Sequence, residues 1–129
     1  MLVRLLAEED VDRPVVADLI YDSADPYAVC MTFQLCQEAS VQWVIGRDLL
    51  LDGQRELTGL GDVQVWPSQD RGVHRVCIAL RPFPEGEPAV LAVSARALEG
   101  FLRRTLDVVP LGTEGRHLDL DSIADHLLD

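Results

Sequence analysis

Lysine and asparagine are both absent from this sequence. The eleven basic side chains are therefore all arginines, and 22 aspartates and glutamates outnumber them, which gives a net charge of -11. Proteins that bind DNA or RNA use basic side chains to displace counterions from the phosphates, and the longest run of bases here is Arg103 and Arg104. The charge balance argues against a nucleic-acid-binding protein and favours a small protein kept soluble by an acidic surface.

Long apolar runs are also missing. No stretch approaches the ~20 apolar residues that a membrane-spanning helix needs. The mainly apolar run at Met1–Ala7 is too short for the core of a signal peptide, and acidic residues follow it at Glu8–Asp10. We therefore expect a cytoplasmic protein that does not insert into membranes.

Cysteine occurs three times, at Cys30, Cys36 and Cys77, without any Cys-x-x-Cys spacing. An odd number without paired spacing is not typical of a disulfide framework or a zinc site. Buried cysteine behaves as a small hydrophobic side chain, and this is the role that we expect for these residues.

Alternating apolar residues run through the N-terminal and central parts of the sequence and predict β-strands. In the segment Val15–Tyr21 the residues Val15, Ala17 and Leu19 fall on one face, and Tyr27 is expected in the core at the start of Tyr27–Leu35. Leu2–Leu6 is expected to be an edge strand, and Pro67–Asp70 is expected to form a loop. The predicted strands are Leu2–Leu6, Val15–Tyr21, Tyr27–Leu35, Val41–Ile45, Asp62–Trp66, Val73–Leu80 and Ala89–Val93.

Three segments break the alternation and predict helices. Arg47–Gly53 is rich in leucine, a good helix former, and it ends at a glycine suited to a helix C-terminus. A longer helix begins after Ser94, whose hydroxyl suits an N-cap, and it stops before Pro110. A short amphipathic helix is predicted from about Asp121. These features predict one strand-rich α+β domain over residues 1–129.

A weak internal repeat connects two of the predicted helices. Val44–Leu49 and Val93–Leu98 share the pattern Val-x-small-Arg-x-Leu, and each lies where a strand passes into a helix. So short a match can arise by chance. Its placement nevertheless predicts two halves, each made of several strands followed by a helix.

Residues with catalytic chemistry are scarce. No serine lies in the Gly-x-Ser-x-Gly turn that exposes a nucleophile. The alternating His117, Asp119 and Asp121 could face one metal ion from a strand, but acids at a helix start also complement its dipole, and we prefer this capping role. We predict no catalytic residue, no metal site, no cofactor and no enzyme.

Trp66, Arg103 and Arg104 are the residues that we select as candidates for partner binding. Trp66 ends a strand segment, where it either covers the core or anchors an interface, as exposed aromatic residues often do. Arg103 and Arg104 are adjacent bases in an acidic protein. They either contact a partner or form a solvated helix face.

Several blocks of the sequence resemble the SsgA-like family of sporulation and cell-division proteins. The second block, Trp43–Gly53, matches a Trp-x-x-Gly-Arg-Asp/Glu-Leu-Leu-x-x-Gly pattern. The blocks occur in order over nearly the whole chain, so their combination is specific. The other blocks are Tyr21–Val29 with Met31–Phe33, Gly61–Val63 with Pro67, Phe101–Thr105, Val108–Glu114 and Leu118–Asp121.

The resemblance implies a fold, a function and partners. Family members have two antiparallel sheets with helices, a fold similar to that of the Whirly single-stranded-DNA-binding proteins, and they assemble as homotrimers. They act as adaptors, not enzymes, in sporulation-specific cell division. They select septum sites, help the tubulin-like division protein to assemble there and affect later spore-wall steps.

The implied partners are that tubulin-like protein or other SsgA-like proteins, and the implied location is cytoplasmic, at the division septum. The alternative is a Whirly-like single-stranded nucleic-acid-binding protein, which the net charge disfavours because function depends on surface chemistry and not on topology.

Overall fold

A computed structural model describes residues 2–6, 12–36, 39–59, 61–81 and 89–117 of the chain. The described part contains seven strands, two α-helices and a 3-10 helix, in chain order. They are β1 (Leu2–Leu6), β2 (Asp12–Ile20), β3 (Ala28–Cys36), β4 (Ala39–Gly46), α1 (Arg47–Gly53), β5 (Val63–Asp70), β6 (Val73–Leu80), β7 (Ala89–Ser94), α2 (Ala95–Val108) and η1 (Glu114–His117).

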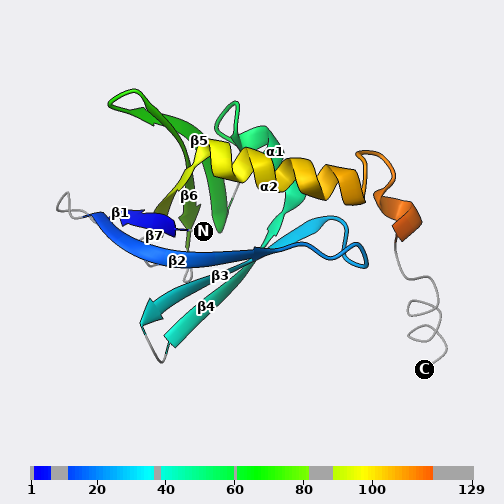
Figure 1. The fold of residues 1–129 in the computed structure, drawn as a ribbon, viewed down its shortest axis with the longest axis horizontal. Coiled ribbons are helices and arrows are strands. Elements are labelled where there is room, and N and C mark those ends of the chain that lie inside the picture. The colour runs from blue at the N-terminus through cyan, green and yellow to red at the C-terminus, as the bar shows by residue number, and fades with distance from the viewer. Residues whose placement is uncertain (1, 7–11, 37–38, 60, 82–88, 118–129) are drawn as a thin grey trace.

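The paired strands are all antiparallel and lie in the order β4-β3-β2-β1-β7-β6-β5. They form two three-stranded sheets, β2-β3-β4 and β5-β6-β7, and β1 pairs with both β2 and β7. Figure 1 shows the two sheets diverging from β1, with α2 lying across them. The predicted α+β fold with two antiparallel sheets and helices is confirmed. The prediction that Leu2–Leu6 is an edge strand is wrong, because β1 is paired on both sides.

The alternating apolar residues of both sheets pack together in one core, as a period of two predicts. Leu98 and Leu102 of α2 and Leu50 of α1 pack onto this core, and each is 1% exposed or less. The expectation that Tyr27 is a core residue is wrong: it precedes β3 and is 52% exposed. The strand residues of the core cluster are Val15, Ala17, Val29, Met31, Phe33, Ile45, Val65, Val76, Ile78, Leu80, Leu91 and Val93.

Strand β5 continues through Pro67 to Asp70, so the loop predicted there is wrong. It is an end strand of the sheet, where proline is tolerated because no neighbouring strand needs its missing N–H. Arg71 and Gly72 form the turn to β6 with φ values of 50° and 80°. Two consecutive positive φ values are typical of a tight hairpin turn whose twist matches the strands.

Both predicted strand-to-helix junctions are confirmed. α1 follows β4, and α2 follows β7 after Ser94, whose hydroxyl accepts a hydrogen bond from the Ala97 N–H at 3.2 Å. The chain therefore has two halves with the same order of elements, β2-β3-β4-α1 and β5-β6-β7-α2. The helix predicted from about Asp121 lies outside the described residues.

Two of the three cysteines have described side chains, and both are free thiols. Cys77 is buried as expected, whereas Cys30 is only half-buried. The Cys36 side chain lies outside the described part. Among the described helices, none is long and apolar enough to cross a membrane.

Candidate partner-binding groove

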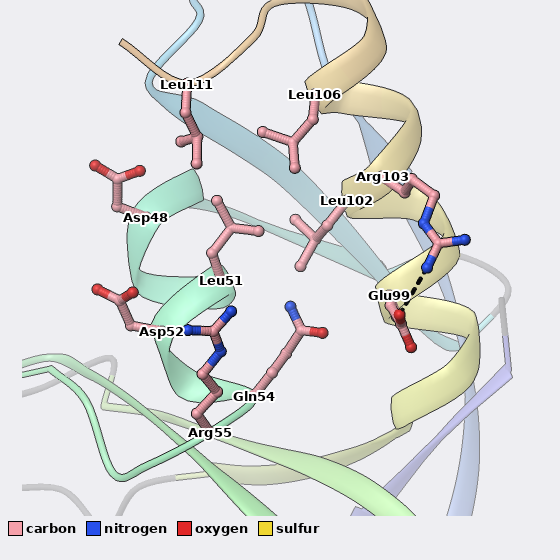
Figure 2. A pocket seen from close by; sticks show the side chains of 10 residues that line it. All are labelled: Asp48, Leu51, Asp52, Gln54, Arg55, Glu99, Leu102, Arg103, Leu106 and Leu111. Carbon is pink, nitrogen blue, oxygen red and sulfur yellow. Dashed lines mark hydrogen bonds and ion pairs between the residues drawn. The ribbon is translucent and has the colours of Figure 1, made fainter.

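A groove of about 560 Å³ lies between α1 and α2. Its centre is made of leucines: Leu51 comes from α1, Leu102 and Leu106 come from α2, and Leu111 follows α2 (Figure 2). An apolar centre with a polar rim is the usual anatomy of a protein–protein interface. The polar lining residues are Asp48, Asp52, Gln54, Arg55, Glu99 and Arg103.

Both walls of the groove use the same helical spacing. Residues at positions i, i+3, i+4 and i+7 share one face of a helix. Because Arg47, Leu50 and Gly53 of α1 are buried, the neighbouring face of this short helix is left to line the groove. The lining residues with this spacing are Asp48, Leu51, Asp52 and Arg55 on the α1 side, and Glu99, Leu102, Arg103 and Leu106 on the α2 side.

The two walls differ in charge. On α2, the Arg103 guanidinium donates to Glu99 Oε1 at 2.8 Å across one helical turn, so these two charges are paired. On α1, Asp48 and Asp52 are exposed, and neither makes an ion pair with any other described residue. With Arg55 as the third charge, the α1 wall carries two negative charges and one positive charge.

A buried arginine fixes the position of α1 against α2. Arg47 is 1% exposed. Its Nη1 donates to the carbonyl oxygens of Thr105 at 3.2 Å and Val109 at 2.7 Å, and its Nη2 donates to Glu114 Oε1 at 2.8 Å. The guanidinium also lies 5.2 Å from the centre of the Tyr21 ring, within cation–π range. One side chain therefore connects the start of α1 with the end of α2, the segment after it and Tyr21, the residue that follows β2.

This arginine acts as a C-terminal cap for α2. The last carbonyl groups of a helix lack intrahelical donors and carry partial negative charge, which a nearby cation stabilises. Glu114 completes the arrangement, because its Oε2 accepts the Gly112 N–H at 2.9 Å while its Oε1 pairs with Arg47. The pKa of Glu114 is lowered, first by its own backbone N–H and then by hydrogen bonds from Arg47 and Gly112, although partial burial opposes this.

The three predicted partner-binding residues lie on three different surfaces. Arg103 lines the groove between the helices. Arg104 lines a separate hollow of about 390 Å³ beside Asp18 of β2. Trp66 is half-buried on β5 and lines a third hollow of about 540 Å³ with the exposed Leu57. The structure does not bring the three together, and their role in binding stays a prediction.

Arg103 is the one groove residue that the sequence selects as a binding candidate, and the four leucines and the other polar residues of the lining are not predicted from it. The i, i+3, i+4, i+7 spacing in the segments 48–55 and 99–106 is a signal that could have identified each stripe. The facing of the two stripes depends on the packing of α1 beside α2. No pattern within either segment contains that information.

The described residues hold no group of three or more His, Cys, Asp or Glu side chains that could bind a metal ion. The alternating set His117, Asp119 and Asp121 is not tested, since the two aspartates and the His117 side chain lie outside the described part. The absence of catalytic residues, metals and cofactors stays a prediction.

Sequence comparison connects the chain with sporulation proteins. Residues 15–114 match the profile of a family described as Streptomyces sporulation and cell division protein, SsgA. The chain is 53% identical over 126 residues to the sporulation-specific cell division protein SsgB of Streptomyces coelicolor, and the alignment covers 98% of this chain and 90% of the relative. SsgB of Thermobifida fusca is 40% identical over 126 residues, covering 97% and 90% of the two chains.

Solved structures agree with these sequence matches. A structure from work on SsgB mutations that correlate to longitudinal cell division in sporulating Streptomyces coelicolor superimposes with a TM-score of 0.85 at 51% identity, covering 92% of this chain and 91% of that one. The crystal structure of an SsgA-like sporulation-specific cell division protein from Thermobifida fusca gives a TM-score of 0.87 at 38% identity, covering 97% and 90%.

Proposed function

The chain belongs to the SsgA family of sporulation and cell division proteins, and we propose that it works in sporulation-specific cell division as a non-enzymatic adaptor. In this proposal the α1–α2 groove binds the tubulin-like cell-division protein, directly or together with other SsgA-like proteins. The adaptor thereby brings that protein to the cytoplasmic side of the division septum. The groove with its four leucines is the observation that carries the proposal.

The construction of the groove supports a binding role. Both walls present amphipathic stripes, and Arg47 at the start of α1 donates hydrogen bonds to the carbonyl groups at the end of α2. A preformed site loses little conformational entropy on binding, which favours affinity. The charges lie at the rim and the leucines at the centre, the arrangement in which apolar anchors supply most of the binding free energy.

We propose in addition that the protein is a homotrimer. Ile20, Cys30 and Val44 form a row across the outer face of β2-β3-β4, since Ile20 pairs with Cys30 and Cys30 pairs with Val44. Ile20 and Val44 are 59% and 63% exposed, and a row of exposed apolar residues supports self-association. Three copies of a weakly binding groove would raise the overall affinity for a polymer by multivalency.

Co-sedimentation with polymers of the tubulin-like division protein tests the proposed function. We expect the unmodified protein to pellet with the polymers and Leu106→Asp, which places a charge in the centre of the groove, to lose most of this binding. Val108→Asp is the matched control, because Val108 lies on the same helix, is 54% exposed and does not line the groove. Thermal unfolding of both variants establishes that they are folded.

Two measurements on the same samples complete the test. Light scattering gives the mass of the assembly, which should be that of three chains. Retention of single-stranded DNA tests the alternative function, and we expect none at ordinary salt. The adaptor proposal is overturned if the unmodified protein pellets neither alone nor with other SsgA-like proteins present, or if Leu106→Asp pellets as well as Val108→Asp.

A further inference from the structure

From the charges and shape of the α1–α2 groove we infer the chemistry of its occupant: a cationic amphipathic helix of the partner, with basic side chains facing Asp48 and Asp52. This inference rests on the proposed function, because it specifies what the groove binds. It commits to one kind of partner segment and to the side of the groove that its basic residues contact.

The shape of the groove fits a helix. On α2 the stripe extends over two helical turns, from Glu99 to Leu106; on the other wall it extends along α1 from Asp48 to Asp52 and ends with Arg55, two residues after the helix. The leucines of the two stripes point toward one another, as Figure 2 shows for Leu51, Leu102 and Leu106. An amphipathic helix binds such a groove through apolar residues at i, i+3 or i+4 and i+7.

The charge of the walls gives the sign of the occupant. Glu99 and Arg103 neutralise each other on α2, and Asp48, Asp52 and Arg55 together leave the lining of the groove with one net negative charge. The acids Asp48 and Asp52 make no ion pair with any other described residue. These two residues are four positions apart and lie on one face of α1. A helix with two lysines or arginines one turn apart can place one base opposite each acid. Long-range attraction adds to this, since the whole chain has a net charge of -11.

The same charges disfavour other occupants. The C-terminal sequence 118–129 has an amphipathic pattern and follows the groove in the chain, but it carries Asp119, Asp121, Asp125 and Asp129. The charge of this segment is negative, like that of the α1 wall, so its binding in the groove would bring like charges together. Single-stranded nucleic acid has the same sign and is disfavoured for the same reason.

Two synthetic peptides of about 14 residues, or four helical turns, test the inference on the full-length protein by fluorescence anisotropy. Both have the same leucine positions, and they differ only in lysine or glutamate at two positions one turn apart. We expect the lysine peptide to bind about tenfold more tightly than the glutamate peptide. We also expect Leu106→Asp to abolish binding of the lysine peptide.

Charge reversal in the groove is the decisive variant. Asp48→Arg combined with Asp52→Arg should reverse the preference, so that the glutamate peptide binds more tightly. Asp62→Arg combined with Asp107→Arg is the matched control, because it changes the net charge equally at exposed positions that do not line the groove. Equal binding of both peptides, no binding of either, or equal effects of the two double variants would overturn the inference.

Polymer co-sedimentation of the same double variants separates this inference from the proposed function. If Asp48→Arg with Asp52→Arg pellets normally while Leu106→Asp does not, the groove binds the division protein but not through a cationic helix, and the inference is wrong. If the lysine peptide binds as expected while no groove variant changes pelleting, the inference stands and the proposed function fails.

Discussion

The two halves of the molecule have the same order of elements but begin their helices differently. In the second half, Ser94 caps α2 through the Ala97 N–H. In the first half, Gly46 precedes α1 and provides no side-chain cap. The first residue of α1 is Arg47, whereas the first residue of α2 is Ala95. One helix start is stabilised locally by a hydroxyl, and the other by a long side chain that reaches into the rest of the fold.

The structural correspondence between the halves is shifted by one residue from the sequence repeat. Aligning the helix starts pairs Ile45 with Val93 and Leu50 with Leu98, and each of these residues is 1% exposed or less. The sequence pattern pairs Val44, which is 63% exposed, with the buried Val93. The predicted two-half architecture is confirmed, but the residue match on which it was based has the wrong register.

The difference between the halves shows that they depend on one another. α1 has seven residues and α2 has 14, and a helix as short as α1 is not stable without tertiary contacts. Arg47 supplies such contacts at the end of α2, so the first half caps the helix of the second half. The joint between the two helices, and with it the groove, depends on one residue that has no counterpart at Ala95.

The largest expected effect comes from removing that residue. Arg47→Met leaves Glu114 and the last carbonyls of α2 buried without their cation, and we expect it to lower the free energy of unfolding by about 3–5 kcal/mol. Arg96→Met changes an exposed arginine in the first turn of α2, and we expect a change within about 0.5 kcal/mol. Urea denaturation of both variants at one protein concentration measures the difference. Equal losses of unfolding free energy in the two variants would show that Arg47 does not stabilise the contact between α1 and α2.

Glycines in the two helices give the next largest contrast. A Cβ at Gly53 would collide with the Val65 side chain, because α1 packs directly on β5 there. We expect Gly53→Ala to lower the free energy of unfolding by about 1–3 kcal/mol through overpacking. A Cβ at Gly100 of α2 meets nothing within 4 Å, so Gly100→Ala should raise it by about 0.5–1 kcal/mol through improved helix propensity.

The same urea denaturation experiment measures both glycine variants. A destabilising Gly100→Ala would mean that α2 packs more closely than the structure shows. A neutral Gly53→Ala would mean that α1 can move away from β5 without loss, and that the first half is less tightly packed than the second.

Much of the fold follows from local patterns in the sequence. Val15 and Ala17 are buried as alternation predicts, and Ser94 caps α2 as its position predicts. The central place of β1 does not follow from its own sequence, because the number of neighbours of a strand depends on the rest of the sheet. Pro67 favours a loop because proline disfavours a paired strand, and only its place at the end of the sheet makes the strand possible.

The candidate site was harder to predict than the fold. The block Trp43–Gly53 identified the family, and Arg47 lies at its centre, but nothing local indicates that this arginine is buried. Its partners at Thr105, Val109 and Glu114 are about 60 residues away in the chain. Trp66 and Arg104 differ in residue type from the acidic surface around them, yet the groove is made by ordinary leucines that two helices bring together.

The smallest expected effect comes from comparing two ion pairs, Arg47–Glu114 and Arg103–Glu99. Both have a 2.8 Å separation, but the Arg47–Glu114 side chains are 1% and 10% exposed, whereas the Arg103–Glu99 side chains are 72% and 57% exposed. An exposed pair adds little to stability. The buried pair should instead contribute to the pH dependence of unfolding, because the pKa of Glu114 is lowered from its ordinary value of 4.5, first by its own backbone N–H and then by the hydrogen bonds from Arg47 and Gly112.

The sign of that dependence follows from linkage. A carboxyl whose pKa is lower in the folded state than in the unfolded state stabilises the fold fully above the unfolded value, and this contribution is lost as the pH falls through the folded value. We therefore expect the stability of the unmodified protein to fall more steeply than that of Glu114→Gln as the pH is lowered below about 5. Between about pH 6 and 8 the difference between the two proteins should be constant, because the carboxylate is ionised in both states. Parallel curves at low pH would show that Glu114 is not held as an anion by Arg47, and the joint between the halves would then depend on the α2 carbonyls alone.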